Sequence, residues 1–370
     1  MTRRRWIILG LVFTAVFIAA IAALAAGDKR QEWAKSGHAN RELIREASVE
    51  ARGLTAAHCG RCHAEQGFKA WLPQLMRGNS GMIAQPDGSP ATIPYLASLG
   101  LTRFSVRPQT CTTCHNDDYS LRVRGDTAVL PAGFQARAVG AGALCMTCHN
   151  TRNGRITWNA PDAGRYTAPH VAAQADVIMG KNVFFVDYGE NFVSPHAAFT
   201  GNACVTCHLT LNPTGHTFAA QKTVCANCHG SNFKAEFVQQ PIEKLIEDLG
   251  HAVGFRMLQQ KARIASIGAW DPQSDRTTEK FAVDGAAIAA VELTEIHGQT
   301  GVKLTLTGGR ELYSQLNQVA DARGTPVFST RDVVVRAAWN YFLFHSDGRE
   351  GVHNPRFART VLGATLEALK

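Results

Sequence analysis

The sequence predicts a mainly α-helical protein with extensive loops and a small β-hairpin in its C-terminal part. Apolar side chains recur at helical spacing near both ends of the chain, and residues 287–307 alternate between apolar and polar on both sides of a short loop. Between these segments glycine and proline are frequent, and one cysteine-containing pentapeptide occurs five times. That pentapeptide predicts what fills the interior of the fold.

The repeated pentapeptide is Cys-x-x-Cys-His, and its five copies use all ten cysteines of the chain. This pattern is the attachment signature of c-type haem. Two thiols at this spacing reach the two vinyl groups of one porphyrin, and the histidine that follows ligates the iron from the same side. We therefore expect five covalently attached haem c groups. The five copies are Cys59-Gly60-Arg61-Cys62-His63, Cys111-Thr112-Thr113-Cys114-His115, Cys145-Met146-Thr147-Cys148-His149, Cys204-Val205-Thr206-Cys207-His208 and Cys225-Ala226-Asn227-Cys228-His229.

Two other uses of the cysteines fit the pattern less well. A structural zinc site needs two Cys-x-x-Cys halves and has no use for a fixed histidine after each, whereas this chain has an odd number of pairs. A disulfide framework is typical of short secreted domains, and a chain of 370 residues does not belong to that class.

The predicted haems also account for the loops. Glycine- and proline-containing stretches such as 78–94, 131–142 and 153–169 are uncommon in an ordinary compact domain. Porphyrins supply apolar surface that secondary structure would otherwise have to provide. We therefore expect a multihaem cytochrome c fold in which haems form much of the core and a short helix carries each motif. The predicted division is a pentahaem-binding domain over 28–235 and a C-terminal helix, hairpin and helix region over 236–370 that packs on it.

Four longer helices and the hairpin are expected outside the motifs. Apolar residues near helical spacing predict the helices, and the alternation around the loop at His297 predicts two paired strands. The predicted helices span residues 31–52, 240–264, 331–345 and 355–369, and the predicted hairpin spans 287–307.

The first 27 residues have the features of an export segment. Residues 3–5 are arginines, and residues 6–26 are apolar without a charge, long enough to span a bilayer. Ala23-Leu24-Ala25 offers a cleavage site, so a signal peptide and an N-terminal transmembrane anchor both fit, with the anchor favoured. Both place the rest of the chain on the periplasmic side of the cytoplasmic membrane, anchored there or secreted to the periplasm or cell surface, because the arginines stay inside. Haem c is attached in that compartment.

The formal charge of +8 does not indicate a nucleic-acid-binding protein. Each haem c adds two propionates, so five oxidised haems change the charge by roughly −5 and five reduced haems by roughly −10. Outside the arginines of the export segment, no run of basic residues and no basic patch interleaved with aromatic residues argues for DNA or RNA. We expect no nucleic-acid partner.

The second axial ligand of each iron decides what that iron can do, since a protein ligand favours electron transfer and an open position permits substrate binding. Of the fourteen histidines, nine lie outside the five motifs. Five of these lie at the start or edge of a segment or between two motifs. Such positions suit an axial ligand to the iron of a haem that is attached elsewhere in the sequence. Five candidates for five irons predict bis-histidine ligation throughout. The five candidates are His38, His170, His196, His216 and His353.

The remaining histidines rank lower. His58 abuts Cys59, so it cannot easily reach the far face of its own haem, although it could serve a neighbouring one. His251, His297 and His345 are interpreted as structural or surface residues. Methionine is the other usual sixth ligand, but the available methionines are interpreted as packing residues: Met76, Met82, Met179 and Met257.

The chain resembles the multihaem cytochrome c superfamily that includes pentahaem nitrite reductase and the octahaem hydroxylamine and tetrathionate enzymes. The resemblance rests on Ser36-Gly37-His38-Ala39, on the fourth and fifth motifs with Gly215-His216-Thr217-Phe218 between them, and on Gly351-Val352-His353-Asn354-Pro355. It implies distal-ligand roles for His216 and His353. One departure matters: pentahaem nitrite reductases usually carry a lysine in place of the motif histidine at the active haem, and here all five motifs end in histidine.

These observations favour an exported electron carrier. We expect bis-histidine haems to pass electrons between a membrane quinol-linked donor and a periplasmic or extracellular acceptor, with redox proteins and the membrane as partners. The alternative is a multihaem reductase of nitrite, hydroxylamine or a sulfur oxyanion with one open haem. No catalytic residue is assigned: Tyr188 and Arg165 are interpreted as structural. The sequence leaves open whether the chain forms a homo-oligomer or binds calcium.

Overall fold

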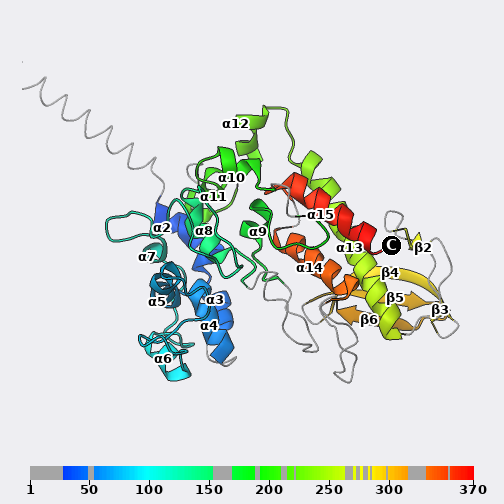
Figure 1. Ribbon diagram of the computed structural model, residues 1–370, viewed down its shortest axis with the longest axis horizontal. Coiled ribbons are helices and arrows are strands. Elements are labelled where there is room, and N and C mark those ends of the chain that lie inside the picture. Colours follow the sequence, from blue (N-terminus) through cyan, green and yellow to red (C-terminus); the bar gives the residue numbers. More distant parts are fainter. Residues whose placement is uncertain are drawn as a thin grey trace, which may run out of the picture. The chain divides into compact units, whose positions relative to one another are not determined.

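Figure 1 shows the computed structural model of the chain, which describes residues 28–48, 54–152, 169–187, 192–209, 215–220, 222–262, 270–271, 276–277, 282–283, 286–296, 299–315, 331–348 and 351–370. The predicted export segment and His297 lie outside the described residues, as do Arg165 and Tyr188. Within the described ranges, no helix is both long and apolar enough to cross a membrane.

The chain divides into two compact units. Unit 1 comprises Met1–Val123 and Asn202–Phe233, and unit 2 comprises Arg124–Gly201 and Lys234–Lys370. Unit 1 carries the first, second, fourth and fifth motifs, and unit 2 carries the third. Residues 124–201 group with the C-terminal residues, and 202–233 group with the N-terminal ones.

Unit 1 consists of short helices joined by loops. Each motif lies in or at the end of one short helix, as the sequence predicts. The helices are α2 (Lys29–Ala34), α3 (Arg41–Ser48), α4 (Leu54–His63), α5 (Glu65–Met76), α6 (Ile93–Ser98), α7 (Cys111–Cys114), α11 (Cys204–His208) and α12 (Ala226–His229), with 3₁₀ turns η1 (Gly37–Ala39), η4 (Gly215–Thr217) and η5 (Lys222–Cys225).

The prediction of one continuous helix over 31–52 is wrong. The segment breaks at Ser36, whose backbone is extended and whose hydroxyl donates to the carbonyl of Trp33 at 2.7 Å. A 3₁₀ turn follows, closed by the Asn40 N–H on the carbonyl of Gly37, before α3 begins. A serine side chain competes with a helix in this way by offering the backbone a local hydrogen bond. The break places His38 in the turn.

The first motif is held by close packing of α4 against its surroundings. A Cβ on Gly67 of α5 would collide with the carbonyl of Gly60, and a Cβ on Gly60 would lie 2.7 Å from the Leu101 side chain. Arg61 is buried and donates from Nη1 to the carbonyl of Gly81 at 2.5 Å. Both variable residues of this motif therefore face protein.

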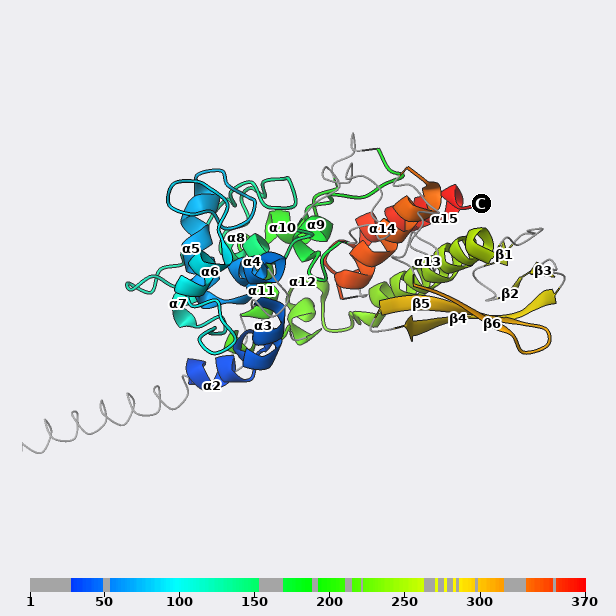
Figure 2. The same ribbon diagram turned by 90° about the horizontal axis from the view of Figure 1, so that it is seen from below.

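Unit 2 contains the longer helices and the sheet. In Figure 2, α13 runs alongside β4 and β5, with which it is in contact. The elements are α8 (Gly142–Cys148), α9 (Gln174–Ile178), α10 (Pro195–Phe199), α13 (Glu236–Ala262), α14 (Val333–Ser346), α15 (Pro355–Ala368), and strands β1 (Trp270–Asp271), β2 (Arg276–Thr277), β3 (Ala282–Val283), β4 (Ala286–Ile296), β5 (Gln299–Leu306) and β6 (Glu311–Gln315).

The predicted hairpin and the three C-terminal helices are confirmed. Strands β4 and β5 pair antiparallel with Val291 opposite Leu304, and they belong to a four-stranded sheet of order β3-β4-β5-β6. The sequence did not predict β3 and β6, because β3 is two residues long and β6 carries little alternation. Helix α13 approaches β5 closely: a Cβ on Gly254 would lie 2.6 Å from Val302.

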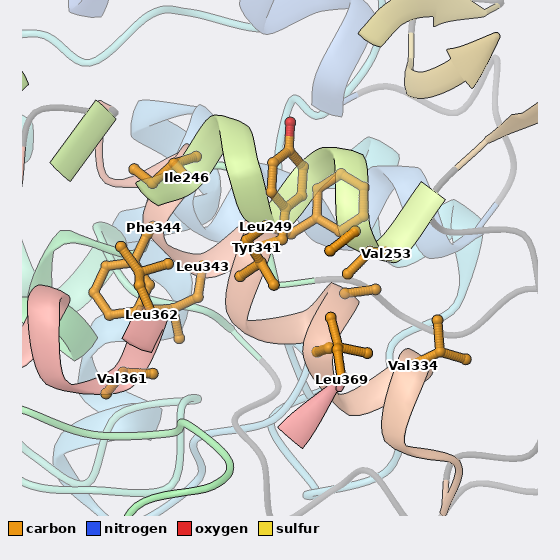
Figure 3. Close-up of a cluster of buried hydrophobic side chains, with 14 of the residues drawn as sticks. Ile246, Leu249, Val253, Val334, Tyr341, Leu343, Phe344, Val361, Leu362 and Leu369 are labelled. Atoms are coloured by element: carbon orange, nitrogen blue, oxygen red, sulfur yellow. The ribbon is translucent and has the colours of Figure 1, made fainter. Parts of the chain in front are cut away.

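An apolar cluster formed largely by α13, α14 and α15 is the core of unit 2. Figure 3 shows Ile246, Leu249 and Val253 of α13 near aromatic and aliphatic residues of α14, and Val361 and Leu362 of α15 belong to the same cluster. Each large apolar side chain buried in this way contributes roughly 1.5–3 kcal/mol. This core fixes the start of α15 at Pro355, two residues after His353.

We predict that Phe357→Ala destabilises unit 2 by about 3–5 kcal/mol, the usual cost of a large cavity. Phe357 is fully buried, and its ring centroid lies 5.4 Å from that of Phe192 and 5.7 Å from that of Phe344. Denaturant unfolding measures the change. The control Val333→Ala, at a side chain 45% exposed, should cost less than about 0.5 kcal/mol. Equal effects of the two substitutions would contradict the packing described here.

Candidate haem-attachment sites and axial ligands

All ten cysteines lie among the described residues, and none of them forms a disulfide. In every motif the two cysteines are three residues apart within a helical turn or its edge, which brings both thiols to one side. All ten are half-buried or exposed rather than sealed in the core. This arrangement fits two thioether bonds to one porphyrin in each motif.

The Cys114 thiol is perturbed by its surroundings. Burial raises its pKa to about 11, with Cys111 adding to the effect. Among the described residues, no group of three or more His, Cys, Asp or Glu side chains gathers as a metal site.

The fourth and fifth motifs lie close together in unit 1. Burial raises the pKa of the Cys207 thiol, and the next contribution is electrostatic repulsion from Cys225, with Cys204 and Cys228 adding to it. An interaction between thiols of different motifs requires them to be near neighbours. Haems attached to these two motifs would therefore be close.

Two motif histidines are oriented by hydrogen bonds from Nδ1. Nδ1 of His115 lies 2.9 Å from the carbonyl oxygen of Tyr119, and Nδ1 of His208 lies 2.8 Å from that of Phe218. A carbonyl oxygen only accepts, so Nδ1 must carry the proton and Nε2 keeps its lone pair for a metal. Nδ1 of His149 lies 3.3 Å from Oε1 of Gln174 in α9.

The two carbonyls that orient His115 and His208 belong to residues with strained backbone. Tyr119 has a φ of 64° and Phe218 a φ of 59°, in the left-handed region that side-chain-bearing residues rarely adopt. Such strain persists only where surrounding structure enforces it, and it concentrates at functional sites. Neither residue is glycine or asparagine, so the left-handed backbone could not be predicted from residue type.

The other two motif histidines end their helices. His63 is the last residue of α4 and is half-buried. His229 is the last residue of α12, and its ring stacks on Phe233 with centroids 4.6 Å apart.

Phe218 gathers three of the predicted ligands in unit 1. Its carbonyl oxygen accepts a hydrogen bond from Nδ1 of His208. Its ring centroid lies 4.6 Å from the ring centroid of His38 and 6.0 Å from the ring centroid of His216. His38 is also tied to the first motif, because its carbonyl accepts from the Gln109 N–H at 3.2 Å and the Gln109 side chain donates to the carbonyl of Cys62. His38 thus adjoins two motifs.

Glu32 fixes the segment that carries His216. Its Oε2 accepts the His216 backbone N–H at 3.0 Å, which lowers the pKa of the Glu32 carboxyl, and Lys29 pairs with the same carboxylate at 3.2 Å. Burial, with the cation of Lys29, lowers the pKa of His216, so its imidazole is neutral near pH 7. Neutral imidazole is the form that ligates a metal.

Two imidazoles of unit 1 have a buried nitrogen that the chain does not satisfy. Across the described residues, Nδ1 of His216 and Nδ1 of His58 are buried without a hydrogen-bond partner. An unpaired buried polar atom costs about 1–3 kcal/mol. Nδ1 of His216 lies 3.8 Å from Oε2 of Glu32, too far for a hydrogen bond. In His216 and His58, Nδ1 is therefore not held by an acceptor as it is in His115 and His208.

Two predicted ligands of unit 2 meet in the segment before α15. Nδ1 of His353 lies 2.7 Å from Oδ1 of Asp347, and Nδ1 of His196 lies 3.1 Å from the carbonyl oxygen of Val352. Asn354 caps α15 by accepting the Phe357 N–H. Both imidazoles are therefore oriented through Nδ1, in the manner of His115 and His208.

The other histidines of unit 2 are placed as follows. His170 is half-buried and its carbonyl accepts from the Ala172 N–H at 2.7 Å, just before α9. His251 is buried on α13, and His345 lies on α14 with its ring centroid 5.4 Å from that of Tyr341. These positions do not test whether His170 ligates a metal, and its role stays a prediction.

Asp176 forms a buried network beside the third motif that the sequence analysis missed. Its carboxyl accepts from the Thr151 N–H and hydroxyl, both at 2.8 Å, and from Nδ2 of Asn182 at 2.5 Å. Burial raises its pKa to about 6, and these hydrogen bonds oppose the rise. The preceding residue of α9, Ala175, donates its N–H to the carbonyl of His149 at 2.9 Å. A lone acid in the apolar run 175–178 was the available signal.

Comparisons with known proteins give little further information. No protein-family model matches the chain, and no curated protein matches it. One solved structure that is similar is the outer cell wall cytochrome OcwA, with 14% identity and a TM-score of 0.47 over 92% of this chain and 50% of that chain. This chain thus spans half the length of OcwA. At that TM-score the likeness carries no argument, so the haem assignment rests on the motifs and on the geometry above.

We predict that Asp176→Ala destabilises unit 2 by about 2–4 kcal/mol near pH 5, because it leaves three buried donors without an acceptor. The folded-state pKa of about 6 lies above the ordinary value of 3.8, so the stability that this carboxyl contributes is full below pH 3.8 and is lost as the pH rises through 6. The difference in unfolding free energy between the two proteins should shrink by about 1 kcal/mol from pH 5 to 7.5. A difference that grows over this range would contradict the assignment.

Proposed function

We propose that this chain is an exported pentahaem c-type cytochrome that transfers electrons between a membrane-linked donor and a periplasmic or extracellular acceptor through bis-histidine haems. The observation that carries the proposal is the combination of five Cys-x-x-Cys-His helical turns with imidazoles whose Nδ1 is committed to the protein. Haem c, when bound, exchanges one electron at its iron. The chain's part is to hold, orient and space these groups.

The proximal ligands are the five motif histidines. His115 and His208 are already held with Nε2 available, because Tyr119 and Phe218 accept their Nδ1 protons. A ring fixed in this way loses little orientational freedom when it binds a metal, and its basicity increases. Both effects favour a stable six-coordinate iron.

The proposed distal ligands are His38, His170, His196, His216 and His353. His38 and His216 flank Phe218 in unit 1, and His196 and His353 meet at Val352 and Asp347 in unit 2. The proximity of the fourth and fifth motifs supports short transfer steps in unit 1. A quinol-linked redox protein as donor, and the membrane through residues 1–27, complete the proposal.

One observation favours the alternative of a reductase with an open haem. Unit 1 carries four motifs but only three histidines outside them, His38, His58 and His216. Its own histidines therefore supply a second imidazole to three of its four irons at most. Nitrite, hydroxylamine or a sulfur oxyanion would be the substrate class of an open iron.

The test is to express the full chain in a host that matures c-type cytochromes. The carrier predicts five haems that remain bound in denaturing electrophoresis and a purely low-spin ferric electron paramagnetic resonance spectrum. A stoichiometric high-spin signal that responds to nitrite or carbon monoxide would favour the reductase. A colourless chain would end both proposals.

His216→Ala should convert one low-spin iron to a high-spin iron that binds carbon monoxide, because its sixth ligand is removed. The matched control is His345→Ala, which removes a half-buried imidazole of α14 that the proposal does not use. The control should retain five low-spin irons. An unchanged spectrum for His216→Ala, with five haems present, would remove His216 from the ligand set.

A further inference from the structure

The pair formed by Asp347 and His353 differs from every other oriented imidazole described above. His115, His208 and His196 donate from Nδ1 to main-chain carbonyls, and His149 lies against an amide oxygen. His353 donates to a carboxylate, at 2.7 Å, the shortest of these separations. Hydrogen bonds to an ionised acceptor are shorter and about twice as strong as those between neutral groups.

The carboxylate is shielded from water, whereas the imidazole is partly open. The Asp347 side chain has no exposed surface, and the His353 side chain is 25% exposed. A charge buried in this way acts at a low effective dielectric, so its influence on a neighbour is larger than at the surface. Asp347 is therefore placed to affect the electron density of one imidazole strongly.

The fold fixes both partners without help from a haem. Asp347 is the C-cap of α14, with its N–H directed at the carbonyl of Phe344. On the other side, Gly351 has a φ of 61°, and a Cβ there would lie 2.5 Å from Ile242, so this turn requires glycine. Asn354 then ties the segment down by donating from Nδ2 to the carbonyls of Val177 and Phe192.

We propose that Asp347 is a positioning residue that lowers the reduction potential of the haem ligated by His353. The carboxylate draws the Nδ1 proton, which makes the imidazole a stronger donor through Nε2 and favours the ferric state. Hydrogen bonding to the axial ligand is one of the means by which a protein sets a haem potential. This inference rests on the proposed function, since it requires His353 to be an axial ligand.

The neighbouring histidine provides an internal contrast. His196 donates to the carbonyl of Val352, the residue next to His353, so the two imidazoles share one backbone segment but have acceptors of different charge. The two residues therefore compare a carboxylate acceptor with a main-chain carbonyl acceptor within one segment.

The test is a spectropotentiometric titration of the five-haem protein and of Asp347→Asn. The asparagine keeps the shape and a neutral acceptor oxygen but removes the charge. One midpoint potential should rise by 59 mV or more, which is a tenfold change in the ferric to ferrous ratio of a one-electron couple. The other four should stay unchanged, and the low-spin signals should be retained.

The matched control is Asp248→Asn, which neutralises another buried carboxylate of unit 2. Asp248 pairs with Nζ of Lys244 at 2.6 Å and with none of the proposed ligands. This substitution should leave all five potentials in place. A structural effect of losing a buried charge would move both variants alike, and that result would overturn the proposal.

Three further outcomes separate a failure of the role proposed for Asp347 from a failure of the proposed function. Asp347→Asn with five low-spin haems and unchanged potentials would overturn the role of Asp347 but leave the proposed function intact. Should Asp347→Asn lose a haem, Asp347→Ser replaces it; loss of a haem in both would make Asp347 purely structural and overturn the proposal. His353→Ala with all irons still low-spin would instead remove His353 from the ligand set, which is a failure of the proposed function.

Discussion

The candidate sites depend on how each imidazole is held by the protein. When Nδ1 donates to an oxygen of the chain, the tautomer is fixed and Nε2 keeps its lone pair, so the ring can ligate a metal without first being reoriented. His115 and His208 in unit 1 and His196 and His353 in unit 2 share this arrangement, although they come from different kinds of segment. Histidines inside and outside the motifs therefore share the same Nδ1 hydrogen bonding to an oxygen of the chain.

Two of the carbonyl groups that accept these hydrogen bonds belong to residues with a strained, left-handed backbone. The left-handed backbones of Tyr119 and Phe218 turn their carbonyls toward motif histidines, and the Gly351 turn presents Val352 and His353 together. The Gly351 turn packs against Ile242 of α13, whereas Tyr119 is largely exposed. In unit 2, helix α13 holds the Gly351 turn in place. In unit 1, the packing of α5 against α4 holds the first motif in place.

Much of this was predictable from the sequence, for identifiable reasons. Periodicity predicted α13, α14 and α15, because each buries one long apolar face, and alternation predicted β4 and β5. It failed at 31–52, where Ser36 and Asn40 form local hydrogen bonds that end the helix. The motifs identify the candidate cysteines and proximal histidines by spacing alone, and their attachment to haem stays a prediction.

The partners of those histidines could not be predicted in the same way. Asp347 stands in Ser346-Asp347-Gly348, which is an ordinary turn sequence, and its contact with His353 depends on where α14 ends. Phe218 and Asp176 act through tertiary contacts that leave no periodic signal. Burial and hydrogen bonding, rather than residue type, identify these positions.

The most direct test of the account is anomalous diffraction at the iron absorption edge from crystals of the mature, haem-loaded chain. We expect five iron positions, each bonded to Nε2 of one motif histidine, with the Nδ1 bonds of His115 and His208 preserved. Fewer than five irons, or an absorption edge of zinc at the cysteine pairs, would contradict it.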